Sequence, residues 1–457
     1  MSASPGPRTA ATPHLRRTLT LWQLVIIGIV TVQPIAPMGI FGSIHNIAGG
    51  HVVTTILLAM FGMLFTAISD GRMARVYPIA GSAYTYATCE IHPAVGYLAG
   101  WAMVMDYVLN PLICTAICSK LSQNVVPSVP YWAWVVFYAS LMTVLNLRGI
   151  KTTARINEGM AAAMMVVIVI FFAAVAQYIF GHRPHITGFF LQPFYNPETF
   201  KSSTLFHGTS LAVLTYIGFE GLSTFSEEVQ NPRRNVLLAT VLVVLTTGLL
   251  SSLQVYAAQL VWGPKPFPSD MVESGFPLVA RQVGGWTMFH LLNFTILFAS
   301  VGSGMGAQLA ASRLLYGMGR GDALPPAFFA AIEPKRRIPR NNVILVGLIA
   351  MGGAFILNFE RGAELLNFGA FIAFMGINAA AFAHYYLRAE RKRLTYFLPP
   401  VLGFLICAFI WWNLGRTAKI AGTVWLIVGL AYGFWRTRAF KINLLNFQVA
   451  AEDEPGS

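Results

Sequence analysis

The sequence predicts an all-α integral membrane protein with twelve transmembrane helices. Of its 457 residues, 56% are hydrophobic and only 11% are charged, whereas about a quarter of the residues in a soluble chain are charged. No Asp, Glu, Lys or Arg occurs between Arg17 and Asp70, and this interval is long enough for two membrane helices of about 20 residues each. Apolar runs of similar length recur along the rest of the chain.

The predicted spans begin directly after a basic N-terminal tail, residues 1–20. The first apolar run is too long for a signal peptide and lacks a clear small-residue cleavage site, so we expect a retained helix. In chain order, the twelve spans are residues 21–44, 52–69, 95–117, 132–147, 159–179, 206–226, 237–261, 288–312, 342–357, 366–385, 396–414 and 421–435. The loops between them are too short for a separate soluble domain.

The net charge of +13 is distributed unevenly along the chain. Most of the 31 Lys and Arg residues fall in segments that are cytoplasmic when the N-terminus is inside. This asymmetry is typical of the positive-inside rule, so the basic charge sets the topology and does not indicate nucleic-acid binding. We therefore expect a multi-pass protein of a bacterial inner membrane, with the bilayer as its surroundings. Both the N-terminal tail and the C-terminal tail, residues 436–457, are expected in the cytoplasm.

Two of the predicted spans are interrupted. The first carries Thr31-Val32-Gln33-Pro34-Ile35-Ala36-Pro37-Met38-Gly39, and the sixth carries Gly218-Phe219-Glu220-Gly221. Unwound backbone at membrane depth is costly unless it lines a cavity and finds hydrogen-bond partners there. A pair of interrupted spans at corresponding positions of two halves indicates the binding site of a secondary transporter.

The two breaks also predict how the helices are grouped. A first five-helix repeat covers residues 21–180, and a second covers residues 206–385, each opening with its broken helix. An odd number of spans per repeat inverts the second relative to the first, and this places the two breaks face to face near the midplane. Helices 11 and 12 follow in residues 396–435. The similarity between the halves is faint, so this grouping rests on the span count and the breaks.

Two of the 18 acidic residues fall inside predicted spans, Asp106 in the third and Glu220 in the sixth. A carboxylate at the centre of a membrane helix costs about 2.5–3.5 kcal/mol on insertion scales, so it is rarely without a role. The alternative is a structural acid that is satisfied by backbone amides or by an ion pair; neither span contains a Lys or Arg, which argues against the ion pair. We predict that both acids bind substrate. Burial favours the protonated form of Glu220, which makes it the candidate proton carrier.

Asp106 begins a polar stripe on its helix. Asp106, Asn110, Cys114 and Cys118 recur every four residues, which places them on one face that we expect to look into the protein. Tyr107 adjoins the stripe and is a candidate to offer its hydroxyl or its ring face to a cation. For Asn110 and Tyr107, helix packing remains an equal alternative. No His or carboxylate completes a metal-ligand set beside the two cysteines, so we predict no metal site.

The backbone at the breaks offers complementary chemical groups. Freed amides at the start of a half-helix suit a carboxylate, and freed carbonyls suit an ammonium group or a small cation. Thr31 and Gln33 precede the first break, and Thr215 and Tyr216 precede the second. We predict that all four contact substrate.

The eighth span contains small residues that suggest further contacts. The hydroxyls of Ser300 and Ser303 suit Na⁺ coordination, but we favour hydrogen bonds to the backbone of their own helix. Gly302 and Gly306 are expected to permit close approach of a neighbouring helix.

Four ordered motifs carry a resemblance to a known family. They are Tyr77-Pro78-Ile79-Ala80-Gly81-Ser82-Ala83-Tyr84-Thr85-Tyr86, then Ser226-Glu227-Glu228 with Asn231-Pro232-Arg233-Arg234, then Ser312-Arg313-Leu314-Leu315-Tyr316-Gly317-Met318-Gly319-Arg320, and finally Leu366-Asn367-Phe368-Gly369-Ala370. With them the chain resembles the amino acid–polyamine–organocation permeases from Leu21 to about Trp435. Within that family it is most similar to the bacterial putrescine-importer branch, through Leu21-Trp22-Gln23, Gly100-Trp101, Asp106-Tyr107 and Gly218-Phe219-Glu220.

The resemblance implies a five-plus-five inverted-repeat fold with alternating access, and a substrate that contains an amine. We therefore predict a permease, not an enzyme, that imports a polyamine such as putrescine or an amino acid. No cofactor is expected; the proton is the favoured coupling ion and Na⁺ the alternative. The main alternative function is an amino-acid permease or antiporter, followed by a channel, a membrane sensor or an intramembrane enzyme. The protein is expected to be a monomer or a homodimer.

Overall fold

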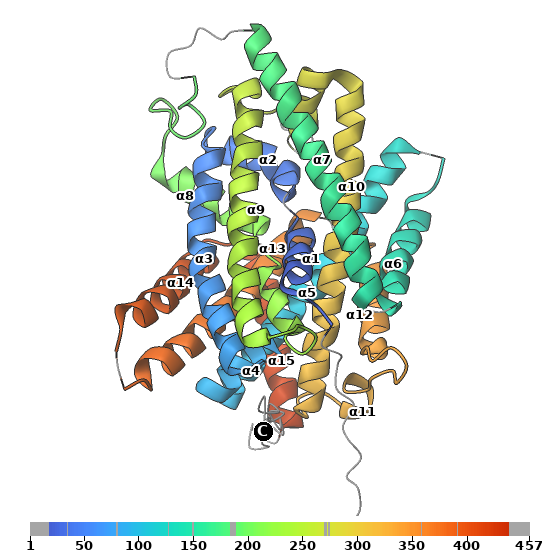
Figure 1. Cartoon of the computed structure of the whole chain (residues 1–457), viewed down its shortest axis with the longest axis vertical. Helices are drawn as coiled ribbons and strands as arrows, with labels where there is room; N and C mark the ends of the chain where they lie inside the picture. Colours follow the sequence, from blue (N-terminus) through green and yellow to red (C-terminus); the bar gives the residue numbers. More distant parts are fainter. Residues whose placement is uncertain are drawn as a thin grey trace, which may run out of the picture.

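The computed structural model is a bundle of α-helices, many of which run along its long axis (Figure 1). It describes residues 18–33, 35–78, 81–126, 128–148, 150–182, 189–268, 272, 275–357, 359–390 and 392–437. The helices of the first half are α1 (Leu21–Val32), α2 (Ala36–Ile47), α3 (Val52–Val76), α4 (Ser82–Glu90), α5 (Pro93–Val125), α6 (Tyr131–Leu147) and α7 (Ile150–His182). These residues contain no strand; one isolated bridge pairs Leu19 with Val229.

The second half is also entirely helical within the described residues. Its elements are α8 (Ser202–Ala212), the 3₁₀ helices η1 (Val213–Thr215) and η2 (Phe219–Phe225), α9 (Pro232–Trp262), α10 (Gly275–Arg320), α11 (Pro326–Phe329), α12 (Arg340–Gly353), α13 (Phe359–Phe382), the π-helix η4 (Ala383–Leu387), α14 (Leu394–Trp412) and α15 (Arg416–Arg436). The all-helical architecture is confirmed.

The break in the first span is confirmed. Helix α1 begins with a capping box, in which Thr20 accepts a hydrogen bond from the Gln23 amide at 3.3 Å and donates its own amide to the Gln23 side chain at 3.1 Å. It ends at Val32, and α2 continues from Ala36 at an angle of 41°. Pro34 lies outside the described residues.

The break in the sixth span is confirmed and is longer than predicted. Regular α-helix ends at Ala212, and the chain then forms the two 3₁₀ helices with Gly218 between them. Gly218 has φ +116°, a left-handed conformation that glycine adopts without the penalty of a Cβ. The interruption therefore covers most of the second half of this span, residues 213–225.

Most helices extend beyond the predicted spans; α5 continues to Val125 instead of residue 117, and α7 begins at Ile150 instead of residue 159. Helix α3 continues to Val76 beyond the predicted end at residue 69, because the chain stays helical and buried through its first charged residue, Asp70. Helix α4 was not predicted. Helix α10 begins earlier than residue 288 and is interrupted by non-helical backbone at Gly284 and Gly285.

Eight helices in the described ranges are long and apolar enough to cross a membrane: α3, α5, α7, α9, α10, α13 with η4, α14 and α15. The bent pair α1–α2 would make a ninth, and α6 is a shorter apolar helix. Helices α8 and α12 are shorter than a full span. The multi-pass architecture is thus confirmed, while the count of twelve and the inverted repeat stay predictions.

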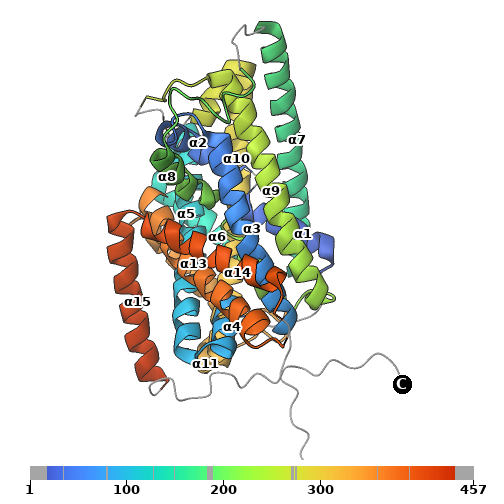
Figure 2. The same ribbon diagram turned by 90° about the vertical axis from the view of Figure 1, so that its left-hand side faces the viewer.

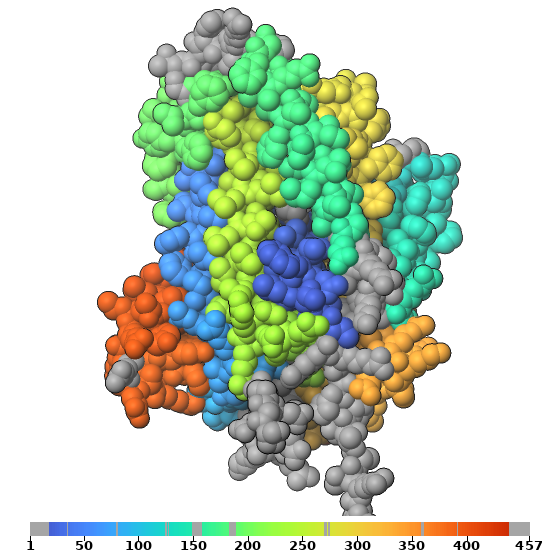
Figure 3. All heavy atoms as spheres, viewed as in Figure 1, coloured from blue at the N-terminus to red at the C-terminus, as the bar shows by residue number. Residues whose placement is uncertain are grey.

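The packing brings both breaks to the centre of the bundle. Helix α1 contacts α7, α9, α10 and η2, and in the space-filling view it occupies the groove between α7 and α9 (Figure 3). Helix α15 flanks the bundle on the side away from α7 (Figure 2), where Trp101 and Trp425 each donate an indole N–H to the other's backbone carbonyl at 2.9 and 3.0 Å. Helices α5 and α10 pack against each other and complete the centre.

The close contact predicted for Gly302 and Gly306 is confirmed. A Cβ on Gly302 would lie 2.4 Å from a methyl carbon of Val30, and one on Gly306 would lie 2.1 Å from Oγ1 of Thr31. Because both distances are far shorter than van der Waals contact, only glycine lets α10 approach α1 at the break.

Candidate functional site

Two hydrogen bonds, one donated by a side chain of each helix, join the first break to α10. Gln33 has φ +60° and donates its side-chain amide to the Ala299 carbonyl at 3.0 Å. The Thr31 carbonyl would bond the amide four residues on in an unbroken helix; here it accepts a hydrogen bond from the Ser303 hydroxyl at 2.6 Å. The prediction that Ser303 bonds its own helix was wrong, because α10 passes close enough to satisfy the freed carbonyl of α1.

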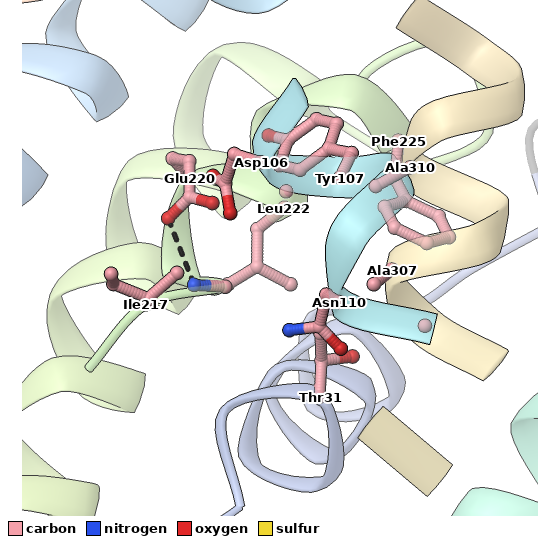
Figure 4. Close-up of a pocket in the computed structure, with 13 residues that line it drawn as sticks. Thr31, Asp106, Tyr107, Asn110, Ile217, Glu220, Leu222, Phe225, Ala307 and Ala310 are labelled. Atoms are coloured by element: carbon pink, nitrogen blue, oxygen red, sulfur yellow. Dashed lines mark hydrogen bonds between the residues drawn. The ribbon is translucent and has the colours of Figure 1, made fainter. Parts of the chain in front are cut away.

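The second break folds its own carboxylate back onto the chain. The Gly218 amide donates to Oε2 of Glu220 at 3.0 Å, as the dashed line in Figure 4 marks. The other oxygen, Oε1, is buried and has no hydrogen-bond partner. Glu220 is 0% exposed. One oxygen therefore stabilises the break, and the other is left to bind something else.

Asp106 of α5 meets Glu220 at this point. The two carboxyl groups face each other (Figure 4) and interact directly. Asp106 is 1% exposed, and its Oδ2 also lacks a hydrogen-bond partner. Two neighbouring buried carboxyls are not both ionised without a compensating charge. The pair therefore needs a proton or a cation.

A small cavity joins this acid pair to both breaks. It measures about 10 Å³, which is at the lower limit of the space that one water molecule needs. Its lining comes from α1, α5, the second break and α10, and consists of Thr31, Asp106, Tyr107, Asn110, Ile217, Gly218, Glu220, Gly221, Leu222, Phe225, Gly306, Ala307 and Ala310. No Lys or Arg is among these described residues.

A larger cavity of about 120 Å³ adjoins the first and shares Asn110 and Ile217 with it. It extends along α2 and the second half of α5 and is lined mainly by apolar side chains, together with Gln33, Cys114 and Ser303. The shared residues place the acid pair beside a space large enough for a small organic molecule.

The predicted site residues divide into three groups. Thr31, Asp106, Tyr107 and Glu220 line the small cavity, and Gln33 lines the larger one. The Tyr107 hydroxyl is buried and has no hydrogen-bond partner.

Thr215 and Tyr216 line neither cavity. The Tyr216 hydroxyl donates instead to the Ile56 carbonyl of α3 at 2.8 Å, because η1 turns this ring toward α3. The structure therefore does not bring these two residues to the acid pair.

The stripe on α5 has two roles along its length. Asn110 lines both cavities, and its Oδ1 accepts hydrogen bonds from Cys114 and Ser303, each at 3.4 Å. Cys118 instead packs against α10 and lies 3.6 Å from the Leu297 carbonyl. The face toward the protein interior is thus confirmed, with cavity lining at one end and helix packing at the other.

A third acid beside this pair, Asp70 of α3, was not predicted from the sequence. It is 0% exposed and interacts with Glu220. The predicted second span ended at residue 69, directly before Asp70, because Asp70 is the first charged residue after the apolar run. The signal that could have found Asp70 is the small and apolar pattern that continues beyond it, with Gly71, Met73 and Ala74 all buried.

The end of the bundle that carries α4, here called the α4 end, is closed by a buried ion pair. Arg313 of α10 donates to Glu228 at 2.5 Å, and their side chains are 1% and 4% exposed. The backbone amides of Thr18 and Leu19 donate to the Glu228 carbonyl at 2.8 and 2.9 Å. These contacts join three segments at the α4 end: the residues before α1, the residues after η2, and α10.

Comparison with known proteins identifies the family. The model of the family described as amino acid permease matches residues 23–441. The chain belongs to this family. The permease is 32% identical to the low-affinity putrescine importer PlaP of Escherichia coli (strain K12), over 96% of this chain and 98% of that protein.

Two further relatives extend the comparison. The branched-chain amino acid permease BcaP of Lactococcus lactis subsp. cremoris (strain MG1363) is 27% identical over 93% of this chain and 95% of its own. The methylthioribose transporter of Bacillus subtilis (strain 168) is 24% identical over 94% and 95%. These homologues are transporters, so the permease is a membrane transporter and not an enzyme.

Proposed function

We propose that this permease is a secondary active transporter of a bacterial inner membrane that imports a small amine by alternating access, with a polyamine such as putrescine as the first candidate. The observation that carries the proposal is the acid pair Asp106 and Glu220, which shares one cavity with both helix breaks and has no cation among its described lining residues. Ammonium groups would supply the positive charge that the two carboxyls lack. The similarity to PlaP supports the same substrate class.

The backbone amides at the breaks favour an amine without a carboxylate. A zwitterionic substrate needs free amides at a half-helix N-terminus. At the start of α2, the Ala36 amide donates to the backbone carbonyl of Gln33 at 2.8 Å, and the Met38 amide donates to that of Ile35 at 2.9 Å. Pro37 has no amide hydrogen. The Gly218 amide is used by Glu220. Among these described amides, no donor remains for a substrate carboxylate without the loss of a present hydrogen bond.

An amino-acid permease or antiporter is the second candidate. The observation in its favour is the similarity to a branched-chain amino acid permease over almost the whole chain. To bind the carboxylate of an amino acid, the backbone amides of the first break would have to give up the carbonyls to which they now donate. They would then donate to the substrate instead. We therefore place it behind the amine.

We further propose twelve spans with both termini in the cytoplasm and two inverted repeats, residues 21–180 and 206–385. The convergence of the two breaks on one cavity supports this arrangement. The segment from α8 through η2, and α12, would supply the spans that are too short to qualify by helix length alone. The proton is the proposed coupling ion, carried by Glu220, with Na⁺ as the alternative.

The test is uptake of labelled putrescine into proteoliposomes with an inward proton gradient, competed by diamines and by amino acids. The proposal expects competition by diamines only and loss of accumulation when the gradient is collapsed. Competition by amino acids, or no putrescine uptake, would move the assignment to the second candidate.

A substitution in the acid pair sharpens this test. Asp106→Asn keeps the size of the side chain and removes the charge that faces an ammonium group. A charge-assisted hydrogen bond contributes about 1.5–3 kcal/mol, so we expect the half-saturation concentration for putrescine to rise roughly tenfold to 100-fold. The matched control is Glu198→Gln, an exposed acid outside the bundle core. Wild-type affinity in Asp106→Asn would refute the proposed contact.

A further inference from the structure

Asp70 is a buried acid whose position calls for a role beyond packing. It is 0% exposed, and both of its carboxyl oxygens lack a hydrogen-bond partner within the described structure. The titratable and polar groups that interact with it are Glu220 and Ser223 of η2, Tyr86 of α4 and Tyr107 of α5. None of these is a cation. A buried carboxyl in such surroundings holds a proton or exchanges one with a neighbour.

The polar groups next to Asp70 continue toward the α4 end. The Ser223 hydroxyl donates to the Ser82 hydroxyl at 2.8 Å, and Ser82 begins α4. The Tyr86 hydroxyl, one turn further along α4, is buried without a hydrogen-bond partner. Asp70 itself lies six residues before the end of α3 at Val76, or about 9 Å along the helix axis. It therefore stands between Glu220 and the α4 end.

The proposed function does not say where the proton of Glu220 goes when the substrate binds. If ammonium groups of a diamine pair with Asp106 and Glu220, the proton that Glu220 carried cannot remain there. A proton released back to the outside would make the carrier an exchanger. For import together with the substrate, a neighbouring base must take the proton while the substrate is bound.

We propose that Asp70 is this base and that it passes the proton onward to the α4 end. While the site is open to the outside, Glu220 takes a proton from water there, and Asp70 is ionised because its own proton left for water at the α4 end in the previous cycle. When an ammonium group pairs with Glu220, the O–H bond of the Glu220 carboxyl breaks and the proton forms an O–H bond on the Asp70 carboxylate. Glu220 is then ionised beside the ammonium group, and Asp70 is neutral. After the α4 end opens, the proton leaves Asp70 for water along the hydroxyls of Ser223, Ser82 and Tyr86. The inference rests on the proposed proton-coupled amine import.

The experiment separates substrate binding from proton movement in proteoliposomes. Putrescine counterflow at equal pH on both sides reports binding and the conformational cycle, because it needs no net proton transfer. A pH-sensitive dye inside the vesicles reports protons that enter with putrescine. The variants are Asp70→Asn, which keeps size and removes the exchangeable proton, and the neighbouring Ser69→Ala, which is equally buried and serves as the control.

We expect Asp70→Asn to keep counterflow within about twofold of wild type. Its putrescine-driven acidification should be lost, accumulation should fall at least tenfold, and uptake should no longer depend on internal pH. Ser69→Ala should match wild type in every assay. Acidification equal to wild type in Asp70→Asn would overturn the relay. A tenfold higher half-saturation concentration in counterflow, with acidification intact, would also overturn it, because Asp70 would then contact substrate.

Two further outcomes are decisive. If wild-type protein shows putrescine counterflow but no acidification, proton coupling itself is refuted, and the relay falls with it. If Asp70→Asn does not fold, as judged by its elution in detergent, Ser223→Ala takes its place. The relay expects slower acidification with unchanged counterflow in that variant, and a wild-type acidification rate would overturn it.

Discussion

Ser303 shows, at the scale of a residue, how an interrupted membrane helix is kept stable. A freed carbonyl at membrane depth has no water to bond, and the Ser303 hydroxyl takes the place of the missing amide at Thr31. Gln33 does the same in the opposite direction, because its side-chain amide satisfies the Ala299 carbonyl of α10. The break is therefore a property of two helices, not of α1 alone.

Replacement of this hydroxyl should destabilise the protein measurably. Ser303→Ala leaves the Thr31 carbonyl without a donor, and an unsatisfied buried acceptor costs about 1–3 kcal/mol. We expect a lower unfolding temperature in detergent and a lower rate of putrescine uptake. Ser300→Ala, one turn away and also lining the larger cavity, is the control. Equal stability of the two variants would show that the Thr31 carbonyl finds another partner.

The sequence was sufficient to identify Asp106 and Glu220 as buried acids, because an acid inside a long apolar run is visible without a structure. It was not sufficient for Asp70, which lies where an apolar run meets several charged residues. In such a place the first charged residue is easily taken for the end of the helix. The sequence also could not predict where the Tyr216 side chain points, because a buried tyrosine beside a break can face either the cavity or a neighbouring helix. That choice depends on how the 3₁₀ turns rotate the chain.

At the scale of an element, the contact between α1 and α10 depends on a missing side chain. Gly306 of α10 lies directly against Thr31, and no atom larger than hydrogen fits between them. Spacing of small residues is visible in sequence and correctly predicted a close helix contact. The partner helix was not predictable, because small residues on one helix do not specify which helix approaches them.

Gly306→Ala should therefore separate α10 from the break. The new methyl group would lie 2.1 Å from Oγ1 and 2.9 Å from Cβ of Thr31, and overpacking of a buried contact typically costs about 1–3 kcal/mol. We expect a lower unfolding temperature and at least a tenfold loss of uptake. Gly159→Ala on α7, where a Cβ would meet nothing within 4 Å, is the matched control. Full uptake by Gly306→Ala would mean that the helices shift without consequence for the site.

At the scale of the whole molecule, the structure is closed at the α4 end and keeps its larger cavity on the side of α2. The Arg313–Glu228 pair, the bridge between Leu19 and Val229, and the segment after η2 all lie on the closed side. Composition alone predicted an all-helical membrane protein, since little else fits so few charges. The conformational state was not predictable, because it depends on contacts between residues far apart in the chain.

Cys89 offers a native reporter of this closure. Burial raises the pKa of its thiol to about 11, so the reactive thiolate is scarce at pH 8 and alkylation should accelerate about tenfold per pH unit. Loss of one partner of a buried ion pair costs about 3–5 kcal/mol, so Arg313→Gln should favour opening at the α4 end. Cys89 is partly buried in this structure; more water would then reach it and lower its pKa toward the ordinary value of about 8.5.

We expect alkylation of Cys89 at pH 8 to be at least tenfold faster in Arg313→Gln, measured by mass spectrometry with the other three cysteines replaced by alanine. The exposed Arg340→Gln serves as the control. If alkylation stays at the wild-type rate while the unfolding temperature falls, the pair stabilises the closed bundle without controlling access.

The buried carboxyls also have an electrical consequence. A membrane potential acts on every charge that crosses its field, by about 2.3 kcal/mol per charge for each 100 mV. Any carboxyl that is ionised when the cargo departs is a negative charge that the empty carrier must bring back through that field. An inside-negative voltage would assist this return, whereas a proton bound to the same carboxyl would make the return indifferent to voltage. The rate of transport should therefore become less sensitive to voltage as the internal solution becomes more acidic.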